Sequence, residues 1–320
     1  MKQKVSILIR AAVSIGLIVL LLYIMRGKYG QIIAALQRTD AALFAAAFAA
    51  YLAALTLASL RLMLIIRAQD IPLLFRESLS LTFIGYFFNN FLPTSIGGDV
   101  VKAYYVSHKK AHERTTSYTA VFVDRAIGLA TMVFMAFCAI LFAGDAVVDP
   151  SIRRMIYVIT AVSAAGIFFL AHKGFAKKFS FLLVPLRPIE KSLRKIYHAI
   201  NRYRHHPWLI IQSLIISVIS QVLYFFSIGF TALSIGSHIS VGEILLRMPI
   251  VSMISLLPSI NGLGVREGST MLLFGPIIGK ENAFAVSILI LAILFIVSII
   301  GGAIYMLSPQ FKVRLNEITT

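Results

Sequence analysis

Long apolar runs constrain this chain more than any other feature of its sequence. At about 1.5 Å of helix per residue, six stretches are long enough to cross a hydrocarbon core of about 30 Å. They are residues 5–25, 41–67, 117–143, 151–172, 207–231 and 283–307. In a chain of 320 residues that is 59% hydrophobic, these runs predict an all-α polytopic membrane protein. We expect residues 1–320 to form a single integral membrane domain, with the first run retained as a signal anchor because no cleavage site follows it.

Two polar, glycine-rich stretches interrupt the apolar pattern. The first reads NNFLPTSIGGDVVKAYYV over residues 89–106, and the second reads ISLLPSINGLGVREGSTMLLF over residues 254–274. Each follows an apolar arm of about 15 residues, or about 22 Å of helix. Such an arm is too short to cross a membrane comfortably and long enough to enter it and return. We therefore expect two re-entrant helical segments in addition to about six full spans.

The distribution of Lys and Arg favours this re-entrant arrangement. With a cytoplasmic N-terminus, nineteen basic residues fall on the cytoplasmic side and eight on the other. A crossing at each motif would instead export the nine basic residues of 172–206. Because basic loops stay cytoplasmic, both termini are predicted to be cytoplasmic. The segment 173–206 is expected to lie as a basic amphipathic loop on the cytoplasmic leaflet, against anionic lipid headgroups.

The two polar stretches also resemble each other. In LPTSIGGDV and LPSINGLGV, a glycine stands four residues after the proline, as Pro93 and Gly97 and as Pro258 and Gly262. With one span between them, the two units would enter the membrane from opposite sides, which predicts an inverted-topology repeat of the kind found in transporters. The first unit covers about residues 41–143 and the second about residues 207–307.

Polarity at membrane depth predicts a cavity at the interface of the repeats. Non-helical backbone is tolerated there only where protein or water satisfies it, and Pro and Gly break helices and allow close approach. The candidate substrate-binding residues are Arg61, Asn89, Asn90, Pro93, Thr94, Ser95, Gly97, Gly98, Asp99, Lys102, Asp124, Arg125, Pro258, Asn261, Gly262, Gly264, Arg266 and Glu267. The alternative for the first motif is a turn at the membrane interface, with Asp99 in water.

Charged residues inside or beside the spans each carry two interpretations. Asp124 and Arg125 lie within the third span, where an isolated charge is costly. Adjacent helical residues face different directions, so each should have a different partner, either for function or to hold the re-entrant arm. Arg61 lines the path or extends to the membrane surface. Arg266 and Glu267 match the charges of the first motif across a pseudo-two-fold axis or cap an extracellular helix.

Signatures of soluble chemistry are lacking in the sequence. It contains no nucleophile elbow, P-loop or zinc motif, so we expect no enzyme activity, no cofactor and no metal. His108 and His112 stand four residues apart beside Glu113, but no third ligand is evident. The net charge of +17 comes from residues that flank the spans rather than from a separate basic domain, so nucleic acid is not an expected partner.

Three segments carry a resemblance to a known family. NNFLPTSIGGDVVKAYYV, TAVFVDRAIGLATMV and LLPSINGLGVREG, in this order, resemble the transmembrane region of lysylphosphatidylglycerol synthases, also called the flippase-like domain family. Arg61 matches the arginine that usually precedes the first motif. The resemblance covers about residues 10–310 and implies translocation of a lipid between leaflets, in the best-understood members an aminoacylated phosphatidylglycerol. Lys102 stands where an arginine is usual, and no soluble synthase domain follows residue 307, which leaves the lipid open.

Two functions of different classes remain compatible with the sequence. The first is a lipid translocase that moves an anionic or aminoacylated phospholipid, or a lipid-linked intermediate, between leaflets. The second is an intramembrane transferase that uses Asp99 or Asp124 as a base, or a membrane partner subunit of a lipid-modifying or glycosyl-transferring enzyme. The lack of a donor-nucleotide motif favours transport. We expect membrane phospholipids as partners and the inner membrane of a bacterial or archaeal cell as the location.

Overall fold

The described part of the chain consists of helices and connecting turns. A computed structural model describes residues 19, 23, 29–91, 97–109, 114–143, 150–171, 203, 206–255, 257, 259 and 262–308. These residues contain no strand, which confirms the predicted all-α class. The helices are α2 (Tyr29–Gln37), α3 (Ala41–Arg67), α4 (Phe75–Phe91), α5 (Gly97–Lys109), α6 (Arg114–Ala143), α7 (Pro150–Ala171), α10 (Pro207–Ser234), α11 (Val241–Ile254), α12 (Val265–Ile278) and α13 (Lys280–Leu307).

Four of these helices are long and apolar enough to cross a membrane. They contain Ala41–Arg67, Thr115–Leu141, Pro207–Ser234 and Lys280–Leu307, so α3, α6, α10 and α13 coincide with predicted spans. The helix α7 forms over the predicted stretch 151–172 but is not among the four, and its crossing stays a prediction. The predicted span 5–25 lies outside the described residues, apart from residues 19 and 23. The chain is an integral membrane protein.

Local residues set the ends of these helices. Asp40 caps α3, because its Oδ1 accepts hydrogen bonds from the N–H groups of Ala42 at 2.8 Å and Leu43 at 2.9 Å. The helix α10 begins with Pro207, whose ring suits a first helical position. Gly279 has a φ of +84° and separates α12 from α13. The last long helix therefore begins at Lys280, three residues before the start predicted from hydropathy.

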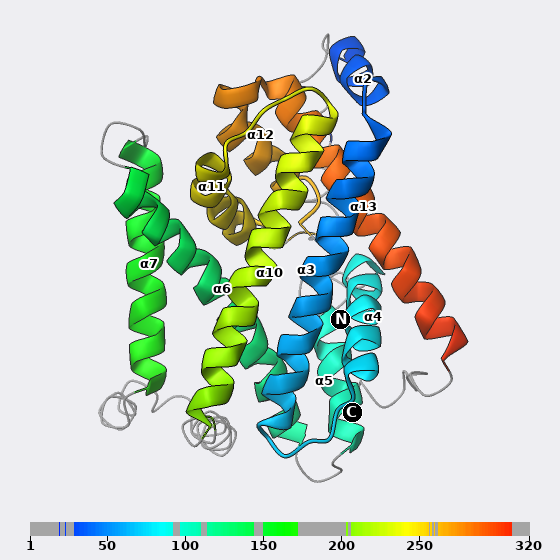
Figure 1. Cartoon of the computed structure of the whole chain (residues 1–320), viewed down its shortest axis with the longest axis vertical. Coiled ribbons are helices and arrows are strands. Elements are labelled where there is room, and N and C mark those ends of the chain that lie inside the picture. The colour runs from blue at the N-terminus through cyan, green and yellow to red at the C-terminus, as the bar shows by residue number, and fades with distance from the viewer. Residues whose placement is uncertain are drawn as a thin grey trace.

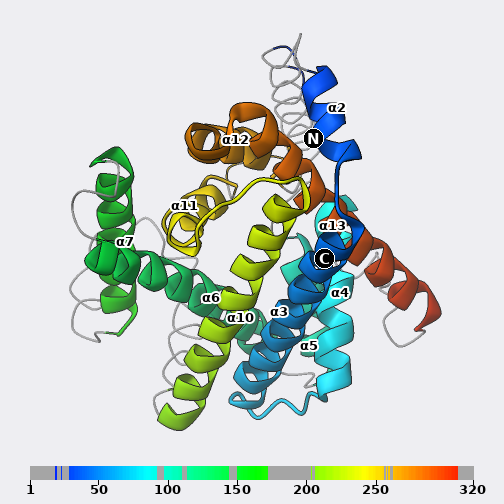
Figure 2. The ribbon, with the colours of Figure 1, turned by 45° about the horizontal axis from the view of Figure 1, so that its top comes forward.

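The helices α3 and α10 form the centre of the molecule, where they lie side by side (Figures 1 and 2). Helix α10 buries its small polar side chains and exposes many of its large apolar ones. The buried set is Ser213, Ser217, Ser220, Ser227, Thr231 and Ser234, and the exposed set includes Ile211, Leu214, Ile215, Val218, Ile219, Val222 and Phe226. This distribution is the one expected for helices that pack through small residues and face lipid with apolar ones.

Two pairs of short helices lie toward opposite ends of the long axis. Figure 1 shows α4 and α5 beside the lower half of α3, and α11 and α12 beside the upper half of α10. The four helices have 17, 13, 14 and 14 residues, or roughly 20–25 Å each at 1.5 Å per residue, which is less than a bilayer core. The polar motifs of the sequence therefore mark the breaks between short helices.

Each short pair packs against the long helix that ends the other half of the chain. Helix α4 contacts α13, and α11 contacts α6. The approach of α4 to α13 is close, since a Cβ added at Gly301 would overlap with the backbone carbonyl of Phe83. The ring of Phe87 lies against Gly302 in the same way. The two halves are thus interlocked rather than only adjacent.

Candidate functional site

The first motif turns the chain between α4 and α5 through a tight contact of glycines. Helix α5 begins with Gly97 and Gly98, and the N–H of Gly98 donates to Oδ1 of Asn89 at 2.7 Å. A Cβ at Gly98 would overlap with the backbone carbonyl of Gly85 on α4. Glycine is therefore required here because the two backbones approach directly. Asn90 follows on the last turn of α4 and is half-buried.

Two cations and one acid gather at the start of α5, and we call them the basic cluster: Asp99, Lys102 and Arg125. Lys102 Nζ lies 3.2 Å from Oδ1 of Asp99. Nη1 of Arg125, from α6, donates to the other carboxylate oxygen of Asp99. Among the described residues, one carboxylate is thus shared by two cations. In a membrane protein, charged side chains at such a depth are expected to pair with one another or to line a polar path.

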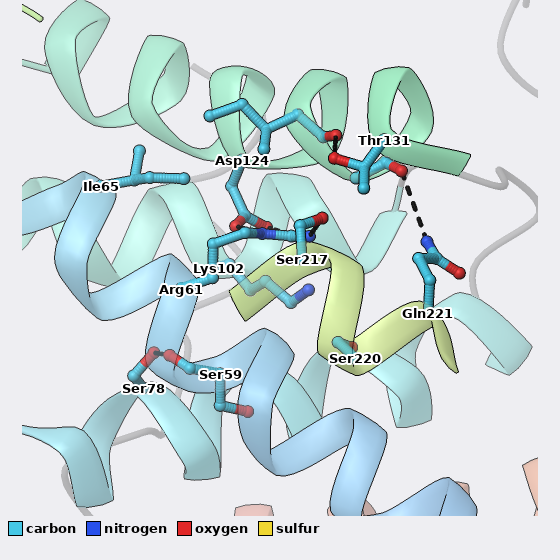
Figure 3. A network of polar contacts seen from close by, with 12 residues as sticks. Ser59, Arg61, Ile65, Ser78, Lys102, Asp124, Thr131, Ser217, Ser220 and Gln221 are labelled. Atoms are coloured by element: carbon cyan, nitrogen blue, oxygen red, sulfur yellow. Dashed lines mark hydrogen bonds and ion pairs between the residues drawn. The ribbon is translucent and has the colours of Figure 1, made fainter. Parts of the chain in front are cut away.

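Arg61 forms a second network, which joins three long helices. Its Nε donates to Oδ1 of Asp124 on α6 at 2.7 Å, and its Nη1 donates to Oγ of Ser217 on α10 at 2.8 Å (Figure 3). The side chains of Arg61 and Asp124 are 9% and 14% exposed. Gly128 leaves room for the guanidinium, because a Cβ there would lie 3.1 Å from Nη1. Arg61 therefore acts in this conformation as a buried link between α3, α6 and α10.

Asp124 and Arg125 have different partners, as their adjacent positions predict. Asp124 pairs with Arg61 on α3, and Arg125 pairs with Asp99 on α5. Neighbouring helical residues point about 100° apart, which lets one turn of α6 contact a long helix and a short one. The dipeptide thus couples the basic cluster to the centre of the bundle.

The second motif pairs its charges locally. Gly262 and Gly264 have φ values of +76° and +81°, a region that glycine adopts without strain. Oε2 of Glu267 accepts a hydrogen bond from the N–H of Gly264 at 2.6 Å, and Oε1 accepts one from Nη2 of Arg266 at 2.7 Å. Glu267 therefore caps α12, while the predicted match of Arg266 and Glu267 to the charges of the first motif stays a prediction.

Some predicted residues lie outside the described part of the chain: Pro93, Thr94, Ser95, Pro258 and Asn261. Other contacts were not predicted, namely those of Ser217 and Gly128 with Arg61. The signal for Ser217 was available in the spacing of Ser213, Ser217 and Ser220 on one face of α10. Gln221 links α10 to α6 as well, since its Nε2 donates to the Gly128 carbonyl oxygen at 3.4 Å (Figure 3).

Metal ligands do not cluster in the described residues. No group of three or more His, Cys, Asp or Glu side chains among them could hold a metal ion. His108, one member of the spaced histidine pair, places Nδ1 2.9 Å from the backbone oxygen of Tyr104, and His112 lies outside the described residues. The polar chemistry of this part of the chain is that of ion pairs and amide, hydroxyl and backbone hydrogen bonds.

Comparison with known proteins gives one match. Residues 7–302 match the family model described as lysylphosphatidylglycerol synthase TM region. No curated protein and no solved structure matches the chain. The match spans both polar motifs, the basic cluster and the Arg61 network.

Proposed function

Because the chain belongs to the lysylphosphatidylglycerol synthase TM region family, we propose that it moves a phospholipid between the two leaflets of a membrane. The substrate has an anionic or aminoacylated headgroup, or is a lipid-linked intermediate with a phosphate. The headgroup follows polar groups between the two halves of the protein while the acyl tails stay in the bilayer. The protein is not an enzyme in this proposal, and membrane phospholipids are its partners.

The two cations that meet at Asp99 in the basic cluster carry this proposal. A phosphate that enters an apolar core must exchange water for protein donors. Arg125 offers a planar fork that suits phosphate oxygens, and Lys102 adds a second cation. The side chain of Arg125 is 31% exposed, against 9% for Arg61. Arg125 is therefore the cation to which we assign the headgroup, and Arg61 is assigned to holding the helices together.

An inverted repeat accounts for the helix contacts, and it forms part of the proposal. The repeat pairs α3 with α10, α4 with α11, α5 with α12 and α6 with α13. When each helix is exchanged for its counterpart, the contact of α4 with α13 becomes that of α11 with α6. The same exchange turns the contact of α5 with α6 into that of α12 with α13. Both short pairs are then re-entrant and enter from opposite membrane faces, which suits alternating access.

The ion pairs of both acids favour transport over the transferase alternative. A general base needs a carboxylate that can reach a substrate proton. Asp124 is bonded to Arg61 through both carboxylate oxygens, at 2.7 and 3.3 Å, and Asp99 is shared by Lys102 and Arg125. A carboxylate held by cations in this way is already engaged and does not offer a free oxygen to a substrate proton.

Translocation in reconstituted vesicles tests the proposal. Fluorescent phospholipids with anionic, zwitterionic and aminoacylated headgroups would be followed by chemical quenching of the outer leaflet. We expect Arg125→Ala to slow translocation of the preferred lipid about tenfold or more, since a hydrogen bond to a charged group contributes about 1.5–3 kcal/mol. Size-exclusion profiles check that the variant stays folded.

Arg154→Ala is the matched control, because it removes the same charge from an exposed position at the start of α7. This control should translocate lipid at the parent rate. If folded Arg125→Ala protein moves every lipid as fast as the parent does, the basic cluster is not the path. Product formation from a lipid-linked substrate would then favour the transferase or partner-subunit alternative.

A further inference from the structure

Three tyrosines from the helices α3, α4 and α10 meet beside α4. Tyr51 on α3 lies edge-on to Tyr86 on α4, with ring centroids 6.3 Å apart, and to Tyr224 on α10, with centroids 6.0 Å apart. The hydroxyl of Tyr51 donates to that of Tyr86 at 3.0 Å. Phenylalanine would pack equally well at each position without the cost of placing a hydroxyl inside the bundle.

Arg266 adds a cation to these hydroxyls from α12. It lies close enough to Tyr51 and to Tyr224 for electrostatic interaction with both. Glu267 holds the guanidinium in place through Nε at 3.2 Å and Nη2 at 2.7 Å. The Arg266 side chain is only 12% exposed. Among the described residues, neither its Nη1 nor the Tyr224 hydroxyl takes part in a hydrogen bond, and both residues are half-buried.

This tyrosine–arginine cluster, Tyr51, Tyr86, Tyr224 and Arg266, lies at the same level of α4 as the basic cluster. The side chain of Lys102 packs against Gly85, and Tyr86, the next residue of α4, contacts Tyr51. Neighbouring residues differ by about 1.5 Å along a helix and about 100° around it. The two clusters therefore occupy adjacent faces of one short helix, one with two cations at Asp99 and the other with an arginine that pairs with Glu267.

We propose that the tyrosine–arginine cluster is a second anion site, which binds a phosphate group through Arg266 and the tyrosine hydroxyls. The chemistry is specific, because a guanidinium and several O–H donors that converge from different helices match phosphate oxygens. Tyr51 and Tyr86 come from the first half of the chain, and Tyr224 and Arg266 come from the second. In its application to a lipid this inference rests on the proposed function, since the phosphate would belong to a headgroup that passes from one cluster to the other around α4.

Binding of short-chain probes to the whole protein in detergent tests this site by calorimetry. The probes are dihexanoyl phosphatidylglycerol, inorganic phosphate and dihexanoylglycerol, which lacks the phosphate. Each is titrated into the parent and into an Arg125→Ala background, in which the basic cluster no longer competes. We expect Tyr224→Phe and Arg266→Lys each to weaken phosphatidylglycerol binding about tenfold or more, because each removes hydrogen bonds to a charged group. Dihexanoylglycerol should not bind at this site.

The two phosphate sources give different results. Binding of phosphatidylglycerol but not of inorganic phosphate, lost in the variants, assigns the site to lipid headgroups. Variant-sensitive binding of inorganic phosphate alone assigns it to a free anion. Tyr157→Phe is the matched control, since it removes an exposed hydroxyl from α7, and it should bind as the parent does.

Equal affinity of the parent, Tyr224→Phe and Arg266→Lys proteins for both phosphate probes would overturn the second site. The same conclusion holds if Tyr157→Phe loses as much affinity as Tyr224→Phe. Failure of the proposed function is a separate outcome: vesicle translocation would then be unchanged in Arg125→Ala, whatever the calorimetry of the tyrosine–arginine cluster gives. Tyr224→Phe keeps the aromatic ring and Arg266→Lys keeps the positive charge, and the folding of both variants is checked by thermal unfolding.

Discussion

The two short helix pairs share an architecture but distribute their charges differently. In α4 and α5, Asp99 is joined to Arg125 of the long helix α6. In α11 and α12, Arg266 pairs with the neighbouring Glu267, and Arg247 pairs with Glu243 on its own helix. Arg247 also donates from Nε to the carbonyl of Leu273 at 2.9 Å, which ties α11 to α12. An ion pair thus joins the first pair of helices to the long helix α6, whereas these ion pairs of the second pair lie within that pair.

The two halves are therefore similar in how their helices pack and different in where their charged side chains lie. Several helix contacts recur under exchange of the halves, as those of α4 with α13 and of α11 with α6 do. The charged side chains do not occupy corresponding positions in the two halves, and each buried ion pair must offset its own cost of desolvation. We therefore expect the two clusters to differ in anion affinity, with the basic cluster the stronger site and the tyrosine–arginine cluster the weaker one.

The largest expected effect concerns the membrane faces from which the two pairs enter. In a Cys138→Ala background, His108→Cys at the end of α5 should react with an impermeant thiol reagent only from the cytoplasmic side. His238→Cys, just before α11, should react only from the other side. Both positions are exposed, so access to the reagent is not limited by burial. Labelling of both from one side would contradict the inverted arrangement.

The next largest effect tests the link between the first pair and the centre of the bundle. Arg61→Met leaves the carboxylate of Asp124 buried without its partner, and we expect it to lower the free energy of unfolding by about 3–5 kcal/mol. Thermal unfolding in detergent, followed by size-exclusion, measures this loss. The double variant Arg61→Met with Asp124→Leu should recover most of the stability. A double variant as unstable as the single one would show that the ion pair itself is not the cause.

A smaller effect compares the glycines of the two pairs. Gly98→Ala should destabilise the protein by about 1–3 kcal/mol, because the new methyl meets the backbone of α4, which cannot move aside. Gly275→Ala in α12 should cost less, since its methyl would meet Cγ of the flexible Lys280 side chain at 3.1 Å. Melting temperatures of the two variants, measured side by side, check the order. Equal losses would mean that the α4 and α5 backbones can separate.

The smallest effect concerns the helix cap of the second pair. Glu267→Gln keeps a side chain that can accept the N–H of Gly264 but removes the charge that neutralises Arg266. We expect a loss of about 0.5–2 kcal/mol, the usual range for weakening a cap. The same variant should increase phosphatidylglycerol affinity at the tyrosine–arginine cluster, because Arg266 is then uncompensated. An unchanged affinity in calorimetry would argue that Arg266 does not contact the anion.

Much of the fold follows from hydropathy, and its details follow from single residues. The predicted span 41–67 coincides with α3 because Asp40 caps the helix directly before the apolar run. Helix α6 begins at Arg114, before the predicted residue 117, because Thr115 and Thr116 are polar but compatible with a helix. Hydropathy records the apolar part of a helix, whereas helix ends depend on caps and on glycine conformation, as at Gly279.

The candidate site was predictable where it depends on local geometry. Different partners for Asp124 and Arg125 follow from the angle between adjacent residues, and the cap formed by Glu267 follows from its distance to Gly264. The convergence of Tyr51 and Tyr224 was not predictable, because it depends on how α3 crosses α10. In an apolar run a tyrosine predicts only a packed aromatic side chain, and the tertiary arrangement is what brings its hydroxyl near a cation.

The contact of α4 with α13 has a consequence for biogenesis. During synthesis the first half leaves the ribosome well before α13 exists, so α4 then lacks the helix against which Phe83 and Phe87 pack. The first half must wait, partly assembled, for the last long helix to be inserted. A chain divided between α7 and α10 should accordingly be degraded when either fragment is produced alone, and accumulate when both are produced in the same cell.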